Sequence, residues 1–372
     1  MKPKDLLLDD ETLFKNEEVF TPSYVPEQFI HRDPQLKALA FSLKPGMRGV
    51  NPINTLVHGP PGTGKTTAVL HVFNQLREAE GKLFAVYVNC EHSNTRFSVF
   101  AKIHEAILGH APPDTGKPLD AVKERAFLKL RQLDKSLIVA LDEIDQLFVR
   151  KNVNEVLIDL LKTQHTYGYS RVGVVGVMID DQLMTQLDVK TRSVFNPERI
   201  HFQPYARSEI LDILQNRADS GFYPGVISKK ILEEIAEKTA QTGDLRVGIN
   251  LLRKSAYLAE RDSSRKITAE HMEKAYESEA RLVGLEKTLK TLSKDEKELL
   301  NLIASNPRDS IESGELYELF NKKTKSGIKK YNEIIAKLEF YKLIDAPYTA
   351  GVKGRTRNII LRHDKKDVLS LL

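Results

Sequence analysis

Short apolar runs alternate with amphipathic segments over the first half of the chain. Four of these runs are typical of buried strands: residues 55–58, 83–88, 137–141 and 172–178. Three segments between them repeat apolar side chains at helical spacing: residues 66–80, 96–108 and 119–133. In the second helix, the side chains expected on the buried face are Phe97, Phe100, Ile103 and Ile107. Strands that alternate with helices predict a parallel, three-layer α/β domain.

The pattern changes twice further along. After Pro204 only helices are expected: residues 207–220, 228–238, 245–260 and 268–281. From Ser293 the pattern predicts helices near 294–304, 314–321 and 327–340, followed by a hairpin centred on 350–357. The first 50 residues are irregular, with one short helix near 35–43. We therefore predict a nucleotide-binding core over 1–203, a helical domain over 204–284 and a third domain over 285–372.

Composition fits a globular, cytoplasmic chain. The 372 residues suffice for two or three domains, with 41% hydrophobic and 29% charged residues. No apolar run approaches the roughly 18 residues that span a bilayer, and the first residues lack a signal-peptide pattern, so no membrane partner is expected. The one cysteine, Cys90, cannot form an internal disulfide, which fits a reducing compartment.

Positive charge is concentrated at one end. Residues 285–372 carry 18 Lys and Arg against 13 Asp and Glu, whereas the preceding residues carry 38 of each. This asymmetry indicates a basic domain that meets a polyanion, although a solvated lysine-rich surface would give the same count.

The strongest motif is GPPGTGKT, residues 59–66, between a predicted strand and a predicted helix. This is the pattern of a P-loop, in which glycines let backbone N–H groups approach phosphate oxygens at a helix N-terminus. Lys65 is expected to contact the outer phosphates, and Thr66 to supply a hydroxyl ligand to Mg²⁺. The phosphate-binding residues expected here are Gly59, Gly62, Thr63, Gly64, Lys65, Thr66 and Thr67.

An acidic pair follows the apolar run 137–141, at the carboxyl end where α/β sheets bind ligands. Asp142 is expected to hold Mg²⁺, and Glu143 to activate the attacking water as general base. Carboxylates after a buried strand are common, but a P-loop upstream favours the catalytic interpretation.

Two arginines can complete such a site. Arg192, in the run DVKTRS, is a candidate finger for a neighbouring protomer's ATP site. Arg246 follows Asp244, a good N-cap, and can reach the γ-phosphate from the first turn of its helix. The alternative for both is an ordinary surface arginine.

With these motifs in place, the chain resembles the archaeal replication initiators related to the first subunit of the origin recognition complex and to cell-division-cycle protein six. The likeness covers nearly the whole chain and rests on the P-loop, LDEID and five further segments: TPSYVPEQFIHRD, QPYARSEILDILQNRA, GDLRVGINLLRKSA, KITAEHMEKAYE and KGRTRNIIL. It implies an α/β P-loop AAA+ core, an α-helical lid and a C-terminal winged-helix domain.

The resemblance also implies roles for single residues. Tyr205 and Arg217 would contact the nucleotide, as would Tyr24 and Arg32 in the N-terminal segment, and Arg246 would be the second sensor. The chain departs from the family at the first sensor, where an asparagine is usual and Ile179 stands. Slow, switch-like hydrolysis of ATP to ADP is therefore expected.

The basic end has the features of a DNA-binding module. Ile328, Tyr331, Ile335 and Leu338 recur at helical spacing and are expected in the core. Seven residues are predicted to contact DNA, four on or beside the helix and three on the hairpin: Ser326, Lys329, Lys330, Asn332, Lys353, Arg355 and Arg357. The resemblance implies a further DNA contact in the segment HAPPDTGKP, where Lys117 is the candidate and a plain surface loop is the alternative.

Three functions fit these features. The first is an initiator that binds double-stranded origin DNA with other initiator protomers, uses ATP or ADP with Mg²⁺, and helps recruit the replicative helicase. The second is a helicase-loader or clamp-loader ATPase, and the third is a promoter-binding regulator. The isoleucine at the first sensor argues against a rapid, DNA-stimulated ATPase.

Overall fold

The computed structural model describes residues 12–79, 81–112, 118–351 and 354–372. The chain divides into two compact units, Met1–Met272 and Glu273–Leu372, which are described separately below. Within the described ranges, no helix combines the length and the apolar character needed to cross a membrane.

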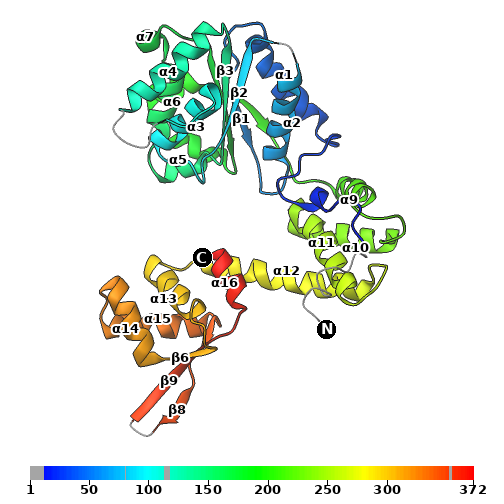
Figure 1. Ribbon diagram of the computed structural model, residues 1–372, viewed down its shortest axis with the longest axis vertical. Helices are drawn as coiled ribbons and strands as arrows, with labels where there is room; N and C mark the ends of the chain where they lie inside the picture. The colour runs from blue at the N-terminus through cyan, green and yellow to red at the C-terminus, as the bar shows by residue number, and fades with distance from the viewer. Residues whose placement is uncertain (1–11, 80, 113–117, 352–353) are drawn as a thin grey trace. The chain divides into compact units, whose positions relative to one another are not determined.

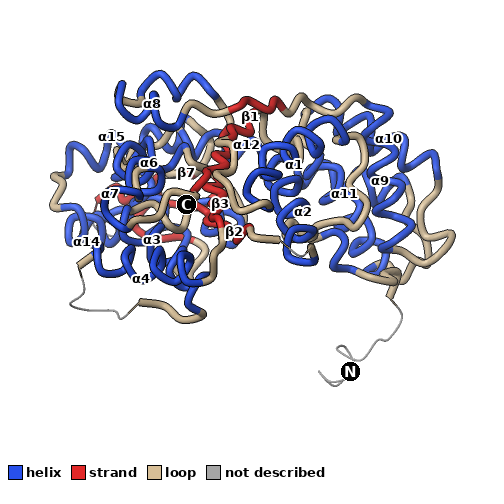
Figure 2. Tube along the Cα trace, turned by 90° about the horizontal axis from the view of Figure 1, so that it is seen from above, coloured by secondary structure: helices blue, strands red, loops and turns tan. Residues whose placement is uncertain are grey.

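The first unit is built on a parallel five-stranded sheet in the order β2-β3-β4-β1-β5. Figures 1 and 2 label β1, β2 and β3 of this sheet. Its strands are β1 (Thr55–His58), β2 (Leu83–Asn89), β3 (Ser136–Asp142), β4 (Val172–Met178) and β5 (Glu198–His201). Every residue of β3 and of β4 is buried, which explains their continuous apolar runs. The predicted parallel α/β sheet is confirmed.

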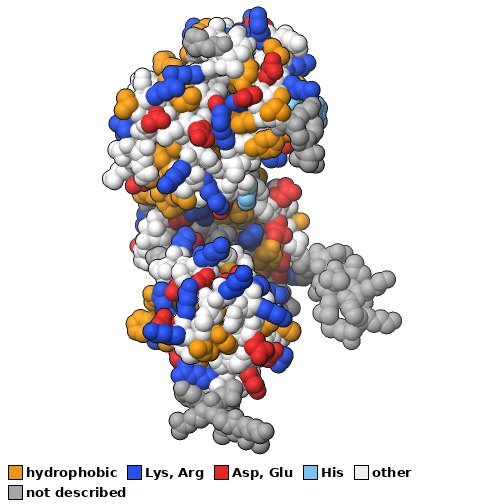
Figure 3. All heavy atoms as spheres, turned by 90° about the vertical axis from the view of Figure 1, so that its left-hand side faces the viewer, with side chains coloured by type: hydrophobic (Ala, Val, Ile, Leu, Met, Phe, Trp, Pro, Cys, Tyr) orange, Lys and Arg blue, Asp and Glu red, His pale blue; other side chains and the backbone are white. Residues whose placement is uncertain are grey.

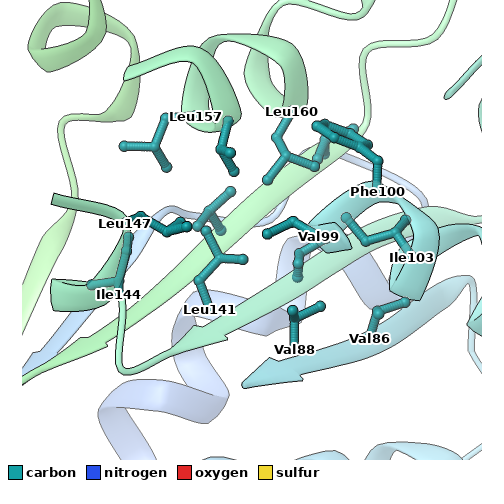
Figure 4. Packing of buried hydrophobic residues seen from close by; sticks show 14 of the residues in the cluster. Val86, Val88, Val99, Phe100, Ile103, Leu141, Ile144, Leu147, Leu157 and Leu160 are labelled. Atoms are coloured by element: carbon teal, nitrogen blue, oxygen red, sulfur yellow. The ribbon is translucent and has the colours of Figure 1, made fainter. Parts of the chain in front are cut away.

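Helices cover both faces of this sheet. One face carries α1 (Asp33–Met47) and α2 (Lys65–Glu78), and the other carries α3 (Arg96–Leu108), α4 (Leu119–Gln132) and α6 (Val153–Leu161) (Figure 1). Figure 4 shows the second face: Val99 and Ile103 of α3 and Leu157 of α6 lie over Val88 and Leu141 of the strands. The shorter helices are η1 (Glu17–Phe20), α5 (Asp145–Val149), α7 (Gln164–Tyr167), η2 (Asp181–Gln186) and α8 (Val189–Phe195).

A helical bundle completes the first unit. It consists of α9 (Arg207–Gly221), α10 (Lys229–Thr242), α11 (Leu245–Arg261) and the start of α12 (Ala269–Lys290). Residues of η1 pack against it: Phe20 stacks on Phe222 with ring centroids 4.6 Å apart. A Cβ on Gly221 would lie 2.3 Å from the Phe20 ring, so this contact requires glycine.

The second unit contains α13 (Lys294–Ala304), α14 (Ser313–Thr324), α15 (Ile328–Phe340) and α16 (Lys365–Leu371). Its strands are β6 (Ser310–Glu312), β7 (Ile344–Asp345), β8 (Tyr348–Gly351) and β9 (Gly354–Leu361), and β9 pairs with each of the other three. Three helices on a small antiparallel sheet with a β8–β9 hairpin form a winged helix, as predicted (Figure 1).

The structure corrects two core predictions. Phe97 is 43% exposed and Ile328 is 52% exposed. Both stand within the first two positions of their helices, α3 and α15, where the apolar face does not yet pack against a neighbouring element. The predicted boundary between residues 284 and 285 lies inside α12, and the division into three domains stays a prediction.

Candidate nucleotide site and nucleic-acid interface

The glycine-rich loop connects β1 to α2 through three left-handed glycines. Gly59, Gly62 and Gly64 have φ values of 143°, 71° and 87°. A Cβ on Gly59 would lie 2.2 Å from the carbonyl oxygen of Phe202, so a side chain cannot fit there. Gly64 is the N-cap of α2, and the helix therefore directs its first free N–H groups into the loop, where an anion binds best.

Lys65 closes over the loop. Its Nζ donates to the carbonyl oxygens of Gly59 at 2.7 Å and Pro60 at 2.8 Å. Burial lowers the pKa of this ammonium group, while Asp142 and other nearby carboxylates act in the opposite sense. Thr63 Oγ1 also donates to Pro60, at 2.9 Å. The loop carbonyls thus hold the ammonium group in a place from which it can exchange them for phosphate oxygens.

Strand β3 delivers Asp142 to the loop. The carboxylate is buried, and its Oδ2 accepts hydrogen bonds from Thr66 Oγ1 at 2.9 Å and from the Tyr87 hydroxyl at 2.6 Å. No group of three or more His, Cys, Asp and Glu side chains within the described ranges can hold a metal ion by itself. A hydroxyl and a carboxylate oxygen in contact nevertheless fit Mg²⁺, which usually takes few protein ligands and completes its shell with water and phosphate.

Glu143 leaves the strand in a left-handed conformation, with φ 54°. Its amide donates to Asp142 Oδ1 at 3.1 Å, and its side chain is exposed, next to the site. Partial desolvation and the carboxylates of Glu91 and Asp142 raise the pKa of Glu143. A carboxylate with a raised pKa is a stronger base for activating water.

Glu143→Gln is expected to leave ATP binding within about twofold and to lower hydrolysis at least about tenfold, because the amide cannot accept a proton. In the unchanged protein, hydrolysis should rise with pH through the raised pKa of Glu143, since only the deprotonated form is a base. Single-turnover hydrolysis against pH measures both. An unchanged rate in the variant would exclude Glu143 as the base.

Ile179 lies where a water-orienting group would be needed. It follows β4, which stands between β3 and β1, so it is next to both the acidic pair and the loop. Its carbonyl accepts from Gly59 N at 3.2 Å, and its amide donates to Asp145 Oδ1 at 3.4 Å. The side chain is 56% exposed and apolar. It therefore cannot hold a water by hydrogen bonding.

The two carboxylates that follow are engaged elsewhere. Asp180 caps η2 by accepting from Gln182 N at 2.9 Å, and Asp181 pairs with Arg199 at 2.6 Å. These contacts leave the position beside the acidic pair to Ile179.

Ile179→Asn is accordingly expected to raise the hydrolysis rate at least about threefold, since an amide can orient the attacking water. Ile179→Leu is the matched control and should leave the rate unchanged. The measurement is single-turnover phosphate release, and equal rates for all three proteins would contradict the role given to this position.

An arginine-tyrosine cluster flanks the loop. Arg32 is 4% exposed, donates to the carbonyls of Thr63 at 3.2 Å and Gln203 at 2.6 Å, and lies 3.7 Å from the ring centroid of Tyr205. Arg32 thus connects the glycine-rich loop to the segment that leads into α9, the first helix of the lid bundle. A Cβ on Gly64 would lie 2.8 Å from the Tyr205 hydroxyl, which places this ring beside the loop.

A second pair continues the cluster. The Arg217 guanidinium lies 4.4 Å from the Tyr24 ring centroid and donates to Val19 O at 2.8 Å. Burial lowers the pKa of Arg217 and raises that of Tyr205, and the charge of each group opposes the shift of the other. The four residues that the resemblance assigned to the nucleotide are thus brought together. Phe29, whose ring would lie 3.0 Å from a Cβ on Gly64, was not predicted.

Arg246 and Arg192 hold contacts within the first unit. Arg246 Nη2 pairs with Asp244 Oδ2 at 2.6 Å, and Asp244 lies against Gly62, so this ion pair stands beside the loop. Arg192 Nη2 donates to the carbonyls of Thr185 at 2.7 Å and Leu187 at 3.0 Å. Arg192 would have to release these two hydrogen bonds to contact a neighbouring protomer, and this intermolecular role stays a prediction.

Helix α15 presents the residues predicted to contact DNA. Lys329 and Asn332 are exposed, and Ser326 is half-buried. Lys330 is also exposed, and it forms an ion pair with Asp295 of α13. Ile328 adds an exposed apolar side chain at the start of the helix.

The hairpin places Arg357 opposite Tyr348 and Arg355 opposite Ala350. Arg357 is half-buried. Lys117 and Lys353 lie outside the described residues, as does the side chain of Arg355. Figure 3 shows Lys and Arg side chains exposed on the visible face of the second unit, mixed with acidic and apolar ones.

Three features together define an AAA+ ATPase. A glycine-rich loop stands at a helix start, an acidic residue ends the next-but-one strand, and a helical lid places the start of α11 against the loop. The family model for an AAA ATPase domain matches residues 28–169, and that for a Cdc6 AAA+ ATPase-type lid domain matches residues 211–277.

Curated relatives match over nearly the whole chain. ORC1-type DNA replication protein 2 of Methanothermobacter thermautotrophicus is 42% identical over 98% of this chain and 96% of its own length. ORC1-type DNA replication protein 3 of Haloarcula marismortui is 39% identical over 100% of this chain and 99% of its own length. The chain belongs to the family of ORC1-type DNA replication proteins, and this membership supports a role in replication initiation.

A solved structure agrees. The Aeropyrum pernix ORC1 protein in complex with DNA is similar with a TM-score of 0.71 and 28% identity, over 97% of both chains. Cdc6p from Pyrobaculum aerophilum is similar with a TM-score of 0.64 and 25% identity, over 97% of this chain and 98% of its own.

Proposed function

We propose that this protein is an ATP-controlled replication initiator that binds duplex origin DNA with other initiator protomers and helps recruit the replicative helicase. The DNA contacts would come from the winged helix and from residues 110–118 of the AAA+ core. The observation that carries the proposal is the contact between the phosphate loop and the lid: Asp244 at the start of α11 lies directly against Gly62. A nucleotide bound in this loop is therefore in reach of a second structural element, as a switch requires.

The residues have distinct parts in this proposal. The loop amides and Lys65 bind the phosphates, and Thr66 with Asp142 would hold Mg²⁺, which when bound neutralises phosphate charge. Arg32, Tyr205, Arg217 and Tyr24 hold the nucleotide between core and lid. Glu143 takes a proton from the attacking water. Because Ile179 cannot orient that water, hydrolysis is slow and each nucleotide state persists.

Support for the DNA-binding part comes from the second unit. Its fold is a winged helix, its sequence carries the excess of basic residues, and Lys329 and Asn332 are exposed on α15. The Aeropyrum pernix relative was solved in complex with DNA. A helix with exposed cations and amides beside a hairpin suits phosphate and base-edge contacts in a major groove.

Turnover with DNA separates this function from that of a loader. We expect the full chain to hydrolyse ATP slowly, with less than about twofold stimulation by a primer-template junction, since switching needs persistence rather than cycling. Steady-state phosphate release with duplex, primer-template and no DNA measures it. Strong stimulation specific to the primer-template junction would contradict the initiator and favour a loader.

A further inference from the structure

The first turn of α11 lies against the glycine-rich loop. A Cβ on Gly62 would lie 1.9 Å from Asp244 Oδ1 and 2.8 Å from the Asp244 Cα. Asp244 is the N-cap of α11, and its Oδ1 accepts from the amide of Arg246 at 2.9 Å. The cap of the lid helix thus places a carboxylate at the edge of the phosphate-binding loop.

The same carboxylate holds the side chain of Arg246. Arg246 Nε donates to Oδ1 and Oδ2 of Asp244 at 3.0 and 3.1 Å, and Nη2 donates to Oδ2 at 2.6 Å. The side chains are 62% and 21% exposed, and solvent-exposed ion pairs are weak. A phosphate group is a strong acceptor for a guanidinium and accepts two parallel hydrogen bonds from it. The Asp244–Arg246 ion pair therefore forms by itself, and a phosphate group can replace Asp244 as the partner of Arg246.

We propose that Asp244 is an internal competitor for Arg246, which holds this arginine until a triphosphate takes its place. The inference rests on the proposed ATP-dependent function. With no nucleotide or with ADP, Arg246 stays on Asp244. With ATP, Arg246 moves to the γ-phosphate and Asp244 keeps only its capping bond. Asp244 thereby lowers the affinity for ATP more than that for ADP, and it makes α11 sensitive to the third phosphate.

Asp244→Asn tests the competition without removing the cap, because Asn caps helices as well as Asp does. We expect ATP to bind about three to five times more tightly, the size of effect expected when an exposed ion pair no longer has to be broken. ADP affinity should change by less than about twofold. Fluorescence titration of labelled ATP and ADP measures the two constants, and the midpoint of thermal unfolding without nucleotide verifies the fold. Asp262→Asn, at the other end of α11, is the control for the charge change and should alter neither affinity.

The second variant, Arg246→Gln, shows whether Asp244 acts through the arginine. In that background, Asp244→Asn should no longer change ATP binding. If it tightens ATP binding equally in both backgrounds, the carboxylate only repels phosphate and the competition is refuted. Weaker ATP binding by the single variant would also overturn it, since Asp244 would then position Arg246 for ATP. A wild-type protein that binds neither nucleotide would instead contradict the proposed function itself.

Discussion

Lys65→Ala is expected to reduce ATP affinity at least about 100-fold. The ammonium group donates hydrogen bonds to two carbonyls of the loop, and in the bound state it would donate to the outer phosphates instead. Hydrogen bonds between charged groups each contribute about 1.5–3 kcal/mol, so the loss of two of them accounts for a factor of this size. Isothermal titration with ATP and Mg²⁺ measures the affinity, and the nucleotide retained through purification gives an independent test.

Lys82→Ala is the matched control. Lys82 is exposed, forms an ion pair with Asp134, and directly precedes β2 rather than joining the loop. Its replacement removes the same charge and should leave ATP affinity unchanged. Equal retention of nucleotide by the Lys65 variant and the native protein would contradict the assignment of the phosphate site.

Loss of two cations from the winged helix is expected to weaken duplex binding by roughly 10- to 100-fold at low salt. Lys329 is exposed on α15, and Arg357 lies on β9 of the hairpin. If about five cations of this unit neutralise phosphates, the logarithm of affinity falls with log salt at a slope near −4 to −5, and Lys329→Ala with Arg357→Ala makes that slope shallower by about 2. Fluorescence anisotropy across a salt series measures both quantities.

The control for this experiment removes two cations from the first unit. Lys37 on α1 and Lys229 on α10 are exposed, and their replacement by alanine changes net charge equally. Their loss should leave the slope unchanged. Native binding that is flat between low and moderate salt would refute the electrostatic contact with duplex DNA.

Local patterns were enough to predict most of the fold. The continuous apolar runs predicted strands β3 and β4 because both are covered on both faces. The helical spacing of apolar residues predicted α3 and α13 with the bounds that the structure has. Five α-helices were not predicted, α5, α6, α7, α8 and α16, because each has at most nine residues, fewer than the window over which a helical period becomes visible. The helix α1 runs further than predicted, since Pro45 lies in its last turn, where it no longer interrupts the helix.

The candidate site was only partly predictable. Lys65, Thr66 and Asp142 follow from a motif with a chemical reason, and the Thr66–Asp142 hydrogen bond brings the predicted Mg²⁺ ligands together. The arginine-tyrosine cluster came from family resemblance, because nothing in local spacing indicates that Tyr24 meets Arg217. The Asp244–Gly62 contact and the Lys330–Asp295 ion pair were not predicted. These contacts join segments far apart in the chain, and tertiary packing alone creates them.

Chromosome-wide mapping of the bound protein, beside a map of where replication starts, tests the central claim most directly. The protein should occupy sites that coincide with replication starts, and the Lys65→Ala variant should show an altered pattern because its nucleotide control is lost. Occupancy confined to promoters, or spread over primer ends without regard to sequence, would contradict the assignment as an initiator.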